Sequence, residues 1–330
     1  MNDTVTTTQA PAGRWLGMDT STACMTIALM EGGRLIEERT ERAERNHSLY
    51  LNPMIDALLE THGMRPGDLA GFAAGLGPGS YTGVRIGVTV AKTMAWALGR
   101  PVIGVSSLEA LAYGTPVEGQ TAGSEAGPEA GRTDEAGGKL WIVPLMDARR
   151  AQAYTGLFEL AYGPGKLLSV SSEGASVVPA SSAAASAAAI PAAPEPGAVR
   201  VSDAGDRSAA GGRWTRLAED GIRRMEDWTE RLLRLADEHR PDRILLVGET
   251  AGFGTFAERL AAGLSAEVQA FGQDIRAYSI GRLARIKEQL GDYSRDPHGI
   301  VPNYTQLAEA EVNLLAKSGG GEVPGGADRA

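Results

Sequence analysis

Apolar residues recur with two different periods along the first part of the chain. Between residues 14 and 41 they form short β-rich runs, and the Gly32–Gly33 pair separates the last two runs as a hairpin signal. Four apolar residues then fall at helical spacing: Leu51, Met54, Ile55 and Leu58. The pattern predicts three strands and a helix over 51–62, which starts near Leu51 or kinks there because Pro53 is best tolerated in a first turn.

The next segment, "GFAAGLGPGSYTGVRIGVTVAKTMAWALG", combines a small-residue strand, a glycine-rich turn and a long apolar helix predicted over 82–98. The strand "RPVIGVSS" and a helix that begins with "LEALAYG" follow. The resulting order of three strands, helix, strand, helix, strand and helix is typical of an α/β protein. It predicts a mixed sheet, in which an antiparallel hairpin set precedes parallel crossover units.

The rest of the chain alternates between ordered patterns and low complexity. "KLWIVPLMDARRAQAYTGLFEL" predicts two strands joined by a polar turn at 147–150, and 214–240 reads as an amphipathic helical stretch. A buried strand, a helix, a further strand and a last helix follow. The predicted division is a disordered leader at 1–13, an N-terminal lobe at 14–114, a flexible insertion at 115–139, a C-terminal lobe at 140–315 with a low-complexity insertion at 171–212, and a disordered tail at 316–330.

The net charge and the cysteine content restrict the kinds of partner and metal site that this chain can have. The 330 residues carry a net charge of -9, which gives no general attraction to a polyanion, so another chain or one local patch must hold most phosphates of any bound nucleic acid. Cys24 is the only cysteine, which excludes internal disulfides and a cysteine-built zinc site and fits a reducing cytoplasm. No apolar run approaches the roughly 20 residues that span a bilayer, so no membrane association is expected.

Two polar turns are candidate phosphate sites. "MDTST" places Asp19, Thr20 and Ser21 at a strand end, where a carboxylate could lie near Mg²⁺ and N–H groups and hydroxyls could hold a phosphate. The same residues are ordinary turn formers, and that interpretation is favoured without other context. Arg149 and Arg150 could likewise contact a phosphate, although a solvated turn is the simpler interpretation.

The helix over 82–98 has an unusual face. Small residues recur at every fourth position, namely Gly83, Gly87, Ala91 and Ala95, and Val84, Val88 and Leu98 flank them. The turn before the helix offers free N–H groups, but its spacing is not that of a P-loop. A glycine inside a helix costs about 1 kcal/mol relative to alanine, and close approach of another element would justify it. The stripe therefore packs either inside its own lobe or against a partner helix.

Histidine placement argues against a metal centre of the usual kinds. The four histidines include no pair four residues apart, because His47 is followed at that spacing by Leu51. A G-x-S-x-G nucleophile motif is also missing from the sequence.

Five segments together resemble the TsaB family, also called YeaZ: "LGMDTSTACMTIAL", "NHSLYLNPMIDALL", "GLGPGSYTGVRIGVTVAKTMAWAL", "PVIGVSSLEALA" and "VPLMDARRAQAYTGLFE". Order and spacing match from Trp15 to about Tyr113 and from Leu140 to about Leu160, with a weaker likeness in "DRILLVGE" and "VPNYTQLAEAEVN". The two low-complexity tracts depart from the family pattern. The resemblance implies an α/β, two-lobed actin-like or Hsp70-like ATPase (ASKHA) fold, with mixed sheets flanked by helices.

The resemblance also implies a role. TsaB proteins are partners in the assembly of threonylcarbamoyladenosine (t6A) beside the anticodon of tRNAs that read codons starting with A. The transferring subunit is TsaD, which binds metal through a His-x-x-x-His helix motif, and TsaE and a TsaC-type synthase complete the set. Leu51 stands here at the place of the second histidine. The expectation is a cytoplasmic, non-catalytic scaffold that binds TsaD, supports TsaE, reaches tRNA only through the complex and forms a homodimer when isolated.

The implied TsaD interface uses the first two helices. Its expected residues are His47, Leu51, Met54, Ile55, Leu58, Gly83, Val84, Gly87, Val88, Ala91, Ala95 and Leu98. No cofactor is expected on this chain alone, and ATP or ADP is placed at the interface of the complex. One alternative is an ATP-binding, kinase-like enzyme that uses Asp19, Thr20 and Ser21 for Mg²⁺ and phosphate and Gly248 near the adenosine. Another is a peptidase-like hydrolase, against which the missing histidine pair counts.

Overall fold

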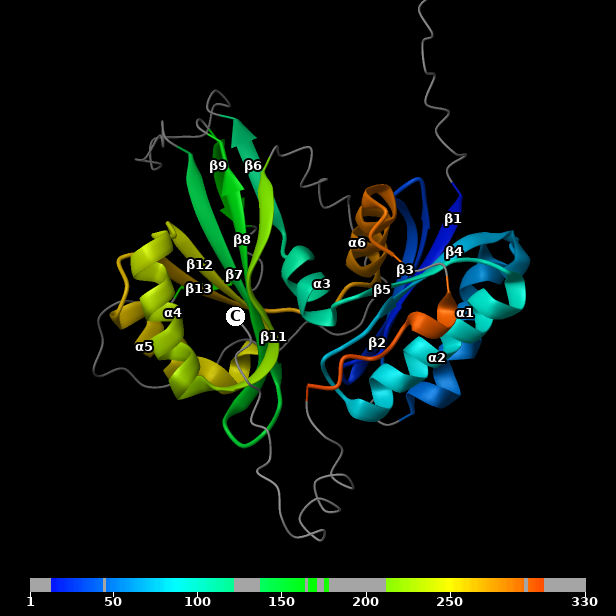
Figure 1. Ribbon diagram of the computed structural model, residues 1–330, viewed down its shortest axis with the longest axis horizontal. Coiled ribbons are helices and arrows are strands. Elements are labelled where there is room, and N and C mark those ends of the chain that lie inside the picture. Colours follow the sequence, from blue (N-terminus) through cyan, green and yellow to red (C-terminus); the bar gives the residue numbers. More distant parts are fainter. Residues whose placement is uncertain are drawn as a thin grey trace, which may run out of the picture.

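The computed structural model describes residues 13–43, 46–121, 137–163, 166–170, 175–177, 212–293 and 296–305. Two lobes lie side by side, each built around a mixed β-sheet with helices against it (Figure 1). This arrangement confirms the predicted α/β, two-lobed actin-like fold class. The predicted leader, the tail from residue 316 and most of both low-complexity tracts lie outside the described residues.

The first sheet has the strand order β3-β2-β1-β4-β5. Its strands are β1 (Arg14–Asp19), β2 (Cys24–Glu31), β3 (Arg34–Arg42), β4 (Leu69–Gly75) and β5 (Val102–Val105). The associated helices are α1 (His47–Thr61), α2 (Tyr81–Leu98), α3 (Ser107–Tyr113) and the short 3₁₀ turn η1 (Pro66–Asp68). The first three strands pair antiparallel, whereas β4 and β5 join β1 in parallel, as the sequence predicts.

The second sheet has the order β10-β13-β12-β7-β8-β11. Its strands are β7 (Gly138–Asp147), β8 (Gln152–Tyr162), β10 (Ala175–Val177), β11 (Arg213–Arg224), β12 (Arg243–Gly248) and β13 (Glu267–Gly272). Helices α4 (Met225–His239) and α5 (Gly254–Ala262) and the turn η2 (Thr250–Phe253) accompany it, and a separate antiparallel pair joins β6 (Val117–Thr121) to β9 (Lys166–Val170).

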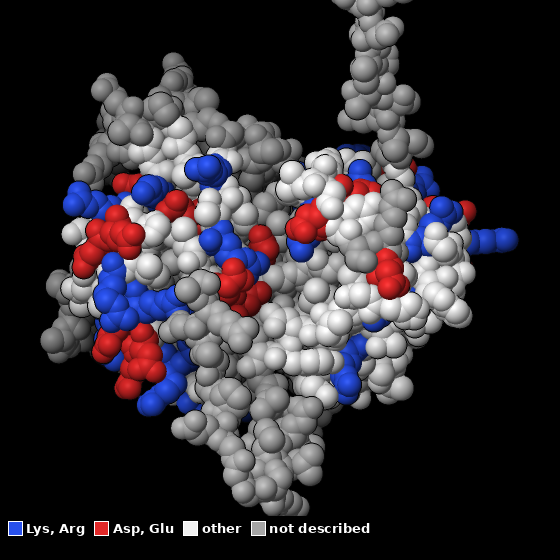
Figure 2. Space-filling model, viewed as in Figure 1, with Lys and Arg blue, Asp and Glu red and all other residues white. Residues whose placement is uncertain are grey.

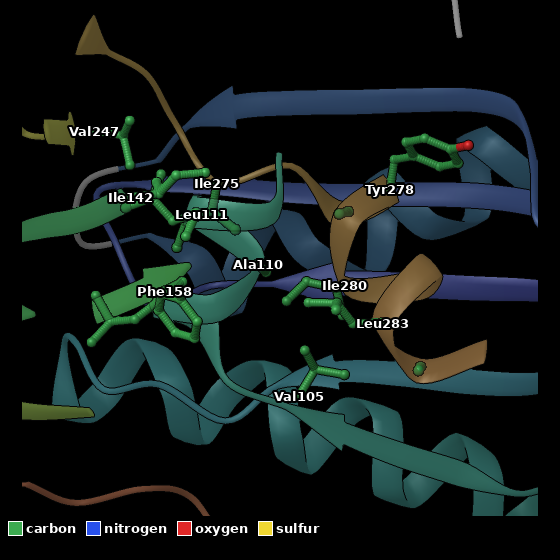
Figure 3. Packing of buried hydrophobic residues seen from close by; sticks show 14 of the residues in the cluster. Val105, Ala110, Leu111, Ile142, Phe158, Val247, Ile275, Tyr278, Ile280 and Leu283 are labelled. Carbon is green, nitrogen blue, oxygen red and sulfur yellow. The ribbon is translucent and has the colours of Figure 1, made fainter. Parts of the chain in front are cut away.

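Three hydrophobic clusters hold these layers together. Alternate residues of β1 and β2 point to opposite faces, so Leu16 and Met18 pack with α1 and α2 whereas Trp15 lies on the other face. That other face meets α3 and α6 (Ala277–Leu290), and the same cluster continues into the second sheet through Ile142 and Phe158. Figure 3 shows side chains from both lobes meeting there. The third cluster packs α4 and α5 on the second sheet.

The predicted lobe boundary differs from the structure at the C-terminal end. Helix α6 and the segment 296–305, which includes the turn η3 (Pro297–Gly299), were expected in the second lobe, but both pack on the first. Gly281 permits this contact, because a Cβ there would overlap the side chain of Met30 on β2. The chain therefore crosses back to the first sheet after β13.

The helical stretch predicted over 214–240 is wrong in its first half. Residues 213–224 form β11, which pairs antiparallel with β8, and the helix begins only at Met225. Two register shifts interrupt the ladder between Arg216 and Gly221. Strand pairing with β8 here outweighs the local helical pattern.

Smaller expectations also need correction. Helix α1 begins at His47 and continues through Pro53. Pro53 has no N–H to donate to the carbonyl four residues before it, but it lies on the exposed side of the helix, where water can bond that carbonyl instead. The first residues of the insertion at 115–139 form β6, and 175–177 within the second tract form β10. Among the described helices, none has both the length and the hydropathy needed to cross a membrane.

Candidate functional site

The loop after β1 carries the predicted phosphate-binding residues. Asp19 is buried, and its Oδ1 accepts hydrogen bonds from the backbone N–H (2.8 Å) and the hydroxyl (2.6 Å) of Ser21. Its Oδ2 accepts a third from the hydroxyl of Ser107 at the start of α3 (2.6 Å). Burial raises the pKa of the Asp19 carboxyl against the opposing effect of these bonds. Both oxygens are thus engaged within the chain.

The hydroxyl groups of this loop are engaged in the same way. Thr20 donates to the carbonyl of Gly83 (2.7 Å), Ser21 donates to Asp19, and Thr22 donates to the carbonyl of Cys24 (3.0 Å). No hydroxyl proton of the loop remains for a bound anion. In this conformation the Asp19 carboxylate and the three hydroxyl groups are bonded to the chain itself, and binding of a nucleotide phosphate or Mg²⁺ here stays a prediction.

Helix α2 supplies the hydrogen-bond partners of Thr20 in this loop. The hydroxyl of Thr20 also accepts from the backbone N–H of Gly87 (3.1 Å), so it bridges the two groups that a regular helical bond between residues four apart would join. A Cβ at Gly83 would overlap the carbonyl oxygen of Thr20, and one at Gly87 would overlap the Thr20 hydroxyl, both inside the 3.0 Å limit of real Cβ contacts. The two glycines therefore admit this loop.

The small-residue stripe consequently faces its own lobe. Ala91 and Ala95 continue it into the hydrophobic cluster beneath α1 and α2. Eleven of the twelve predicted interface residues are buried in the chain: His47, Leu51, Met54, Ile55, Leu58, Gly83, Val84, Gly87, Val88, Ala91 and Ala95. Leu98 is partly buried against the same cluster. The structure corrects this residue set, because buried side chains offer no contact to a partner in this conformation. Docking of a partner on α1 and α2 stays a prediction.

His47 has a local structural contact. Its Nε2 lies 2.9 Å from the carbonyl oxygen of Thr22, so the side chain connects α1 to the loop after β1. Within the described residues, no group of three or more His, Cys, Asp or Glu side chains is placed to hold a metal ion.

Exposed apolar side chains gather on the outer side of the same helices. Of the seven large exposed hydrophobic residues in the described part of the chain, six lie on α1, on α2 or in the segment 296–305: Leu49, Tyr50, Tyr81, Trp96, Val301 and Tyr304. We call these six residues the outer face. Trp96 is 69% exposed. In Figure 2 the lower part of the first lobe, where Figure 1 places α2, shows few charged groups, whereas the outer helices of the second lobe are densely charged. A concentration of this kind is typical of an interaction surface.

A groove of about 440 Å³ runs between α2 and the segment 296–305. Lys92 lines it and connects α2 to the segment by donating to the carbonyl of Ile300 (2.8 Å). The guanidinium carbon of Arg85 lies 4.7 Å from the ring centre of Tyr81 and 5.8 Å from that of Tyr304. The groove is thus lined by two cations and by aromatic rings, including that of Trp96.

Two further predicted positions lie at strand ends of the second sheet. Gly248 ends β12 with φ 108°, and a Cβ there would overlap the carbonyl of Leu145 and the side chain of Leu111. Arg149 and Arg150 lie exposed in the turn between β7 and β8, as the sequence predicts. Within the described residues, neither position forms a hydrogen bond or ion pair with the loop at Asp19.

Sequence reasoning missed a polar network that connects α3 to β11. Arg216 pairs with Glu109 (2.6 Å) and Asp220 (2.5 Å), and Ser106 donates to Asp220 (2.5 Å). Burial raises the pKa of Asp220, against the lowering influence of Arg216. The serine pair at 106–107 before a helical pattern is a capping signal, and Ser106 does cap α3. The network itself joins residues about a hundred positions apart, so local sequence does not reveal it.

The raised pKa of Asp19 gives a testable pH dependence. An acid whose pKa is higher in the folded state stabilises the fold most below its unfolded value, 3.8, and that contribution is lost as the pH rises through the folded value. Asp19→Asn cannot ionise. We expect the unfolding temperature of Asp19→Asn to increase relative to that of the wild type as the pH rises from about 4 to 8. Thermal unfolding followed by circular dichroism measures this difference. The exposed Asp56→Asn is the control, and a pH-independent difference for Asp19→Asn would contradict the assignment.

The family model described as "TsaD: tRNA N6-adenosine threonylcarbamoyltransferase" matches residues 39–271, more than half of the chain. A Bacillus subtilis protein named "tRNA threonylcarbamoyladenosine biosynthesis protein TsaB" is 40% identical over 149 residues, which are 45% of this chain and 56% of that protein. The Escherichia coli protein of the same name is 39% identical over 101 residues, 31% of this chain and 43% of that one. The chain therefore spans about half the length of the curated relatives it matches.

Solved structures support the fold. A Pseudomonas aeruginosa protein described as similar to peptidase YEAZ superposes with a TM-score of 0.54 at 22% identity, over 89% of this chain and all of that one. YeaZ from Pseudomonas aeruginosa gives 0.52 at 21% identity, over 88% and 100%. Taken with the family-model match and the named relatives, this chain belongs to the family of the TsaD-type model and, within it, to the TsaB (YeaZ) proteins.

Proposed function

We propose that this chain is a non-catalytic docking subunit for t6A modification of tRNA, which acts by binding a TsaD-type transferase. The outer face is the observation that carries the proposal. It combines exposed aromatic and aliphatic side chains from two helices and from a distant segment of the chain, and aromatic residues are the most frequent energetic anchors of protein interfaces. The exposed residues replace the buried ones as the expected contact set.

The closed loop at Asp19 supports the non-catalytic part of the proposal. A catalytic or phosphate-binding loop keeps donors or a carboxylate directed at its ligand, whereas Asp19, Thr20 and Ser21 are bonded to the chain itself. The chain also has no histidine pair at the spacing that a helix needs to hold a metal ion. We retain no kinase-like or peptidase-like proposal, because no observation favours either.

The partners follow from the names of the relatives. Those proteins are t6A biosynthesis proteins, and the matching family model describes the transferase. We propose that a TsaD-type chain binds on the outer face, that TsaE acts on the resulting complex, and that two copies of this chain associate when no partner is present. Any nucleotide belongs at the interface of the complex.

Reconstitution tests the proposal. Unmodified tRNA is incubated with TsaC, TsaD, TsaE, threonine, bicarbonate and ATP, with and without this chain, and t6A is measured by mass spectrometry of the digested nucleosides. We expect t6A only when the chain is present, and no t6A when the chain replaces TsaD. Equal t6A without the chain, or transfer by the chain in place of TsaD, would refute the proposal.

A further inference from the structure

The turn between β7 and β8 has a backbone that its residues disfavour. Arg149, Arg150 and Ala151 all have positive φ, at 65°, 54° and 57°. Left-handed backbone is disfavoured for every residue with a Cβ, and glycine would adopt it freely. Tight hairpin turns use this backbone, but they favour glycine or asparagine in it, whereas this turn has two arginines and an alanine.

The surrounding bonds hold the turn in one shape. The backbone N–H of Arg149 donates to Oδ1 of Asp147 (2.8 Å), Gln152 donates to the carbonyl of Arg149 (3.0 Å), and Met225 at the start of α4 donates to the carbonyl of Ala151 (3.3 Å). The turn therefore has fixed support from two elements of the second lobe. In Figure 1 the hairpin end projects at the lower edge of this lobe, away from α1.

The guanidinium groups of Arg149 and Arg150 are free to bind an external anion. Both side chains are exposed, and neither forms a side-chain hydrogen bond or ion pair within the described part of the chain. Arg224, which lies opposite Gln152 on β11, is a third cation nearby, and it forms an exposed ion pair with Glu226 (3.9 Å). Arg149 and Arg150 are thus two adjacent arginines without an ion pair in the described part of a chain of net charge -9.

The acidic residues beside the turn are directed elsewhere. Asp147 accepts from the backbone of Arg149, and Oε2 of Glu249 accepts from the backbone N–H of Asp147 (2.6 Å). Both carboxylates are therefore bonded to main-chain N–H groups rather than to the arginine side chains. The cations at the tip are left for an external anion.

We propose that the β7–β8 turn is a phosphate-binding site for the backbone of tRNA, contacted by Arg149 and Arg150. Guanidinium groups pair with phosphate oxygens through planar, two-pronged hydrogen bonds, and the fixed turn presents both side chains without a cost for ordering the backbone. The choice of RNA rests on the proposed function, whereas the turn is separate from the outer face. The chain then contacts tRNA directly as well as through its partner.

Binding of an unmodified tRNA transcript to the full chain, followed by fluorescence anisotropy over a range of salt concentrations, tests the proposal. We expect Arg149→Gln with Arg150→Gln to weaken binding roughly fivefold per lost phosphate contact at 0.1 M salt, and to reduce the slope of log K against log salt by about 0.7 for each contact. Arg234→Gln with Arg259→Gln removes the same charge from exposed positions on α4 and α5, and should change neither quantity.

A second pair of variants separates the side chains from the backbone shape. Arg150→Gly and Ala151→Gly should each raise the unfolding temperature by a few degrees because both relieve the left-handed backbone. Only Arg150→Gly should lose affinity for tRNA. Equal losses in both would assign binding to the shape of the turn and overturn the proposal.

Three other outcomes also overturn it. The first is no measurable salt-dependent binding of tRNA by the wild-type chain, and the second is an equal loss of affinity in the control pair. The third is that Arg149→Gln with Arg150→Gln binds tRNA as the wild type does but loses affinity for the TsaD-type partner, which would assign the turn to an acidic protein surface. None of these results bears on the reconstitution without this chain, so failure here is distinguishable from failure of the proposed function.

Discussion

Gly87→Ala is expected to destabilise the chain, although alanine is the better helix former by about 1 kcal/mol. The new Cβ would overlap the hydroxyl of Thr20, which bridges Gly83 and Gly87 from the loop after β1. Overpacking at a buried contact costs about 1–3 kcal/mol of unfolding free energy. Gly83→Ala should destabilise more, because its Cβ meets the carbonyl oxygen of Thr20 and backbone cannot rotate away.

Thr20→Ala distinguishes the two glycines. It removes the hydroxyl that a side chain at Gly87 would meet and leaves the Cβ of residue 20 at an ordinary 3.5 Å, so Gly87→Ala should be nearly harmless in that background. Gly83→Ala should stay destabilising, since Thr20→Ala leaves the backbone oxygen in place. Urea unfolding of the single and double variants gives the coupling free energies.

Gly254→Ala is the matched control for these variants. Gly254 starts α5, and a Cβ there would have no neighbour within 4 Å, so the substitution should be neutral or slightly stabilising. If Gly87→Ala lowers the free energy of unfolding by the same amount with and without the Thr20 hydroxyl, the stripe does not pack against the loop after β1.

Trp96→Ala is expected to lower the affinity for a TsaD-type partner by about 30-fold or more, the effect of losing an aromatic anchor at the centre of an interface. Tyr304→Ala, on the opposite wall of the groove, should have an effect of the same kind. Because Trp96 is 69% exposed, the unfolding temperature of the isolated chain should hardly change. Calorimetric titration with the partner and thermal unfolding together measure both quantities.

Leu290→Ala is the control for partner binding. Leu290 is 76% exposed at the end of α6, outside the outer face, so its loss should leave the affinity unchanged. A wild-type affinity for Trp96→Ala would show that the partner binds elsewhere.

The sequence predicts the first lobe well because its signals are local. The order of strands and helices along the chain, the turn at Gly32 and the start of α2 each follow from spacing within a few residues. The return of α6 to the first sheet depends instead on contacts such as Gly281 with Met30, which are distant in sequence. The local pattern of 213–224 predicts helix, and the strand forms because these residues pair with β8, which lies far away along the chain.

The candidate site shows the same limit. Periodicity identifies a flat face on α2, but an internal loop and an external helix require the same small residues at Gly83 and Gly87. The bridging hydroxyl of Thr20 decides between them, and only the structure shows it. The outer face could have been found as the complement of the stripe, since Trp96 follows Ala95 directly and points to solvent.

The most direct measurement of the central claim is the rate of t6A formation in the reconstituted system with two variants of this chain. Asp19→Asn removes the only carboxylate of the loop after β1, and Trp96→Ala removes an anchor of the outer face. If the chain contributes a docking surface and no catalytic group, Asp19→Asn supports the wild-type rate, whereas Trp96→Ala lowers the rate until its concentration is raised to restore binding. A rate abolished by Asp19→Asn, with folding and partner affinity intact, would contradict the account.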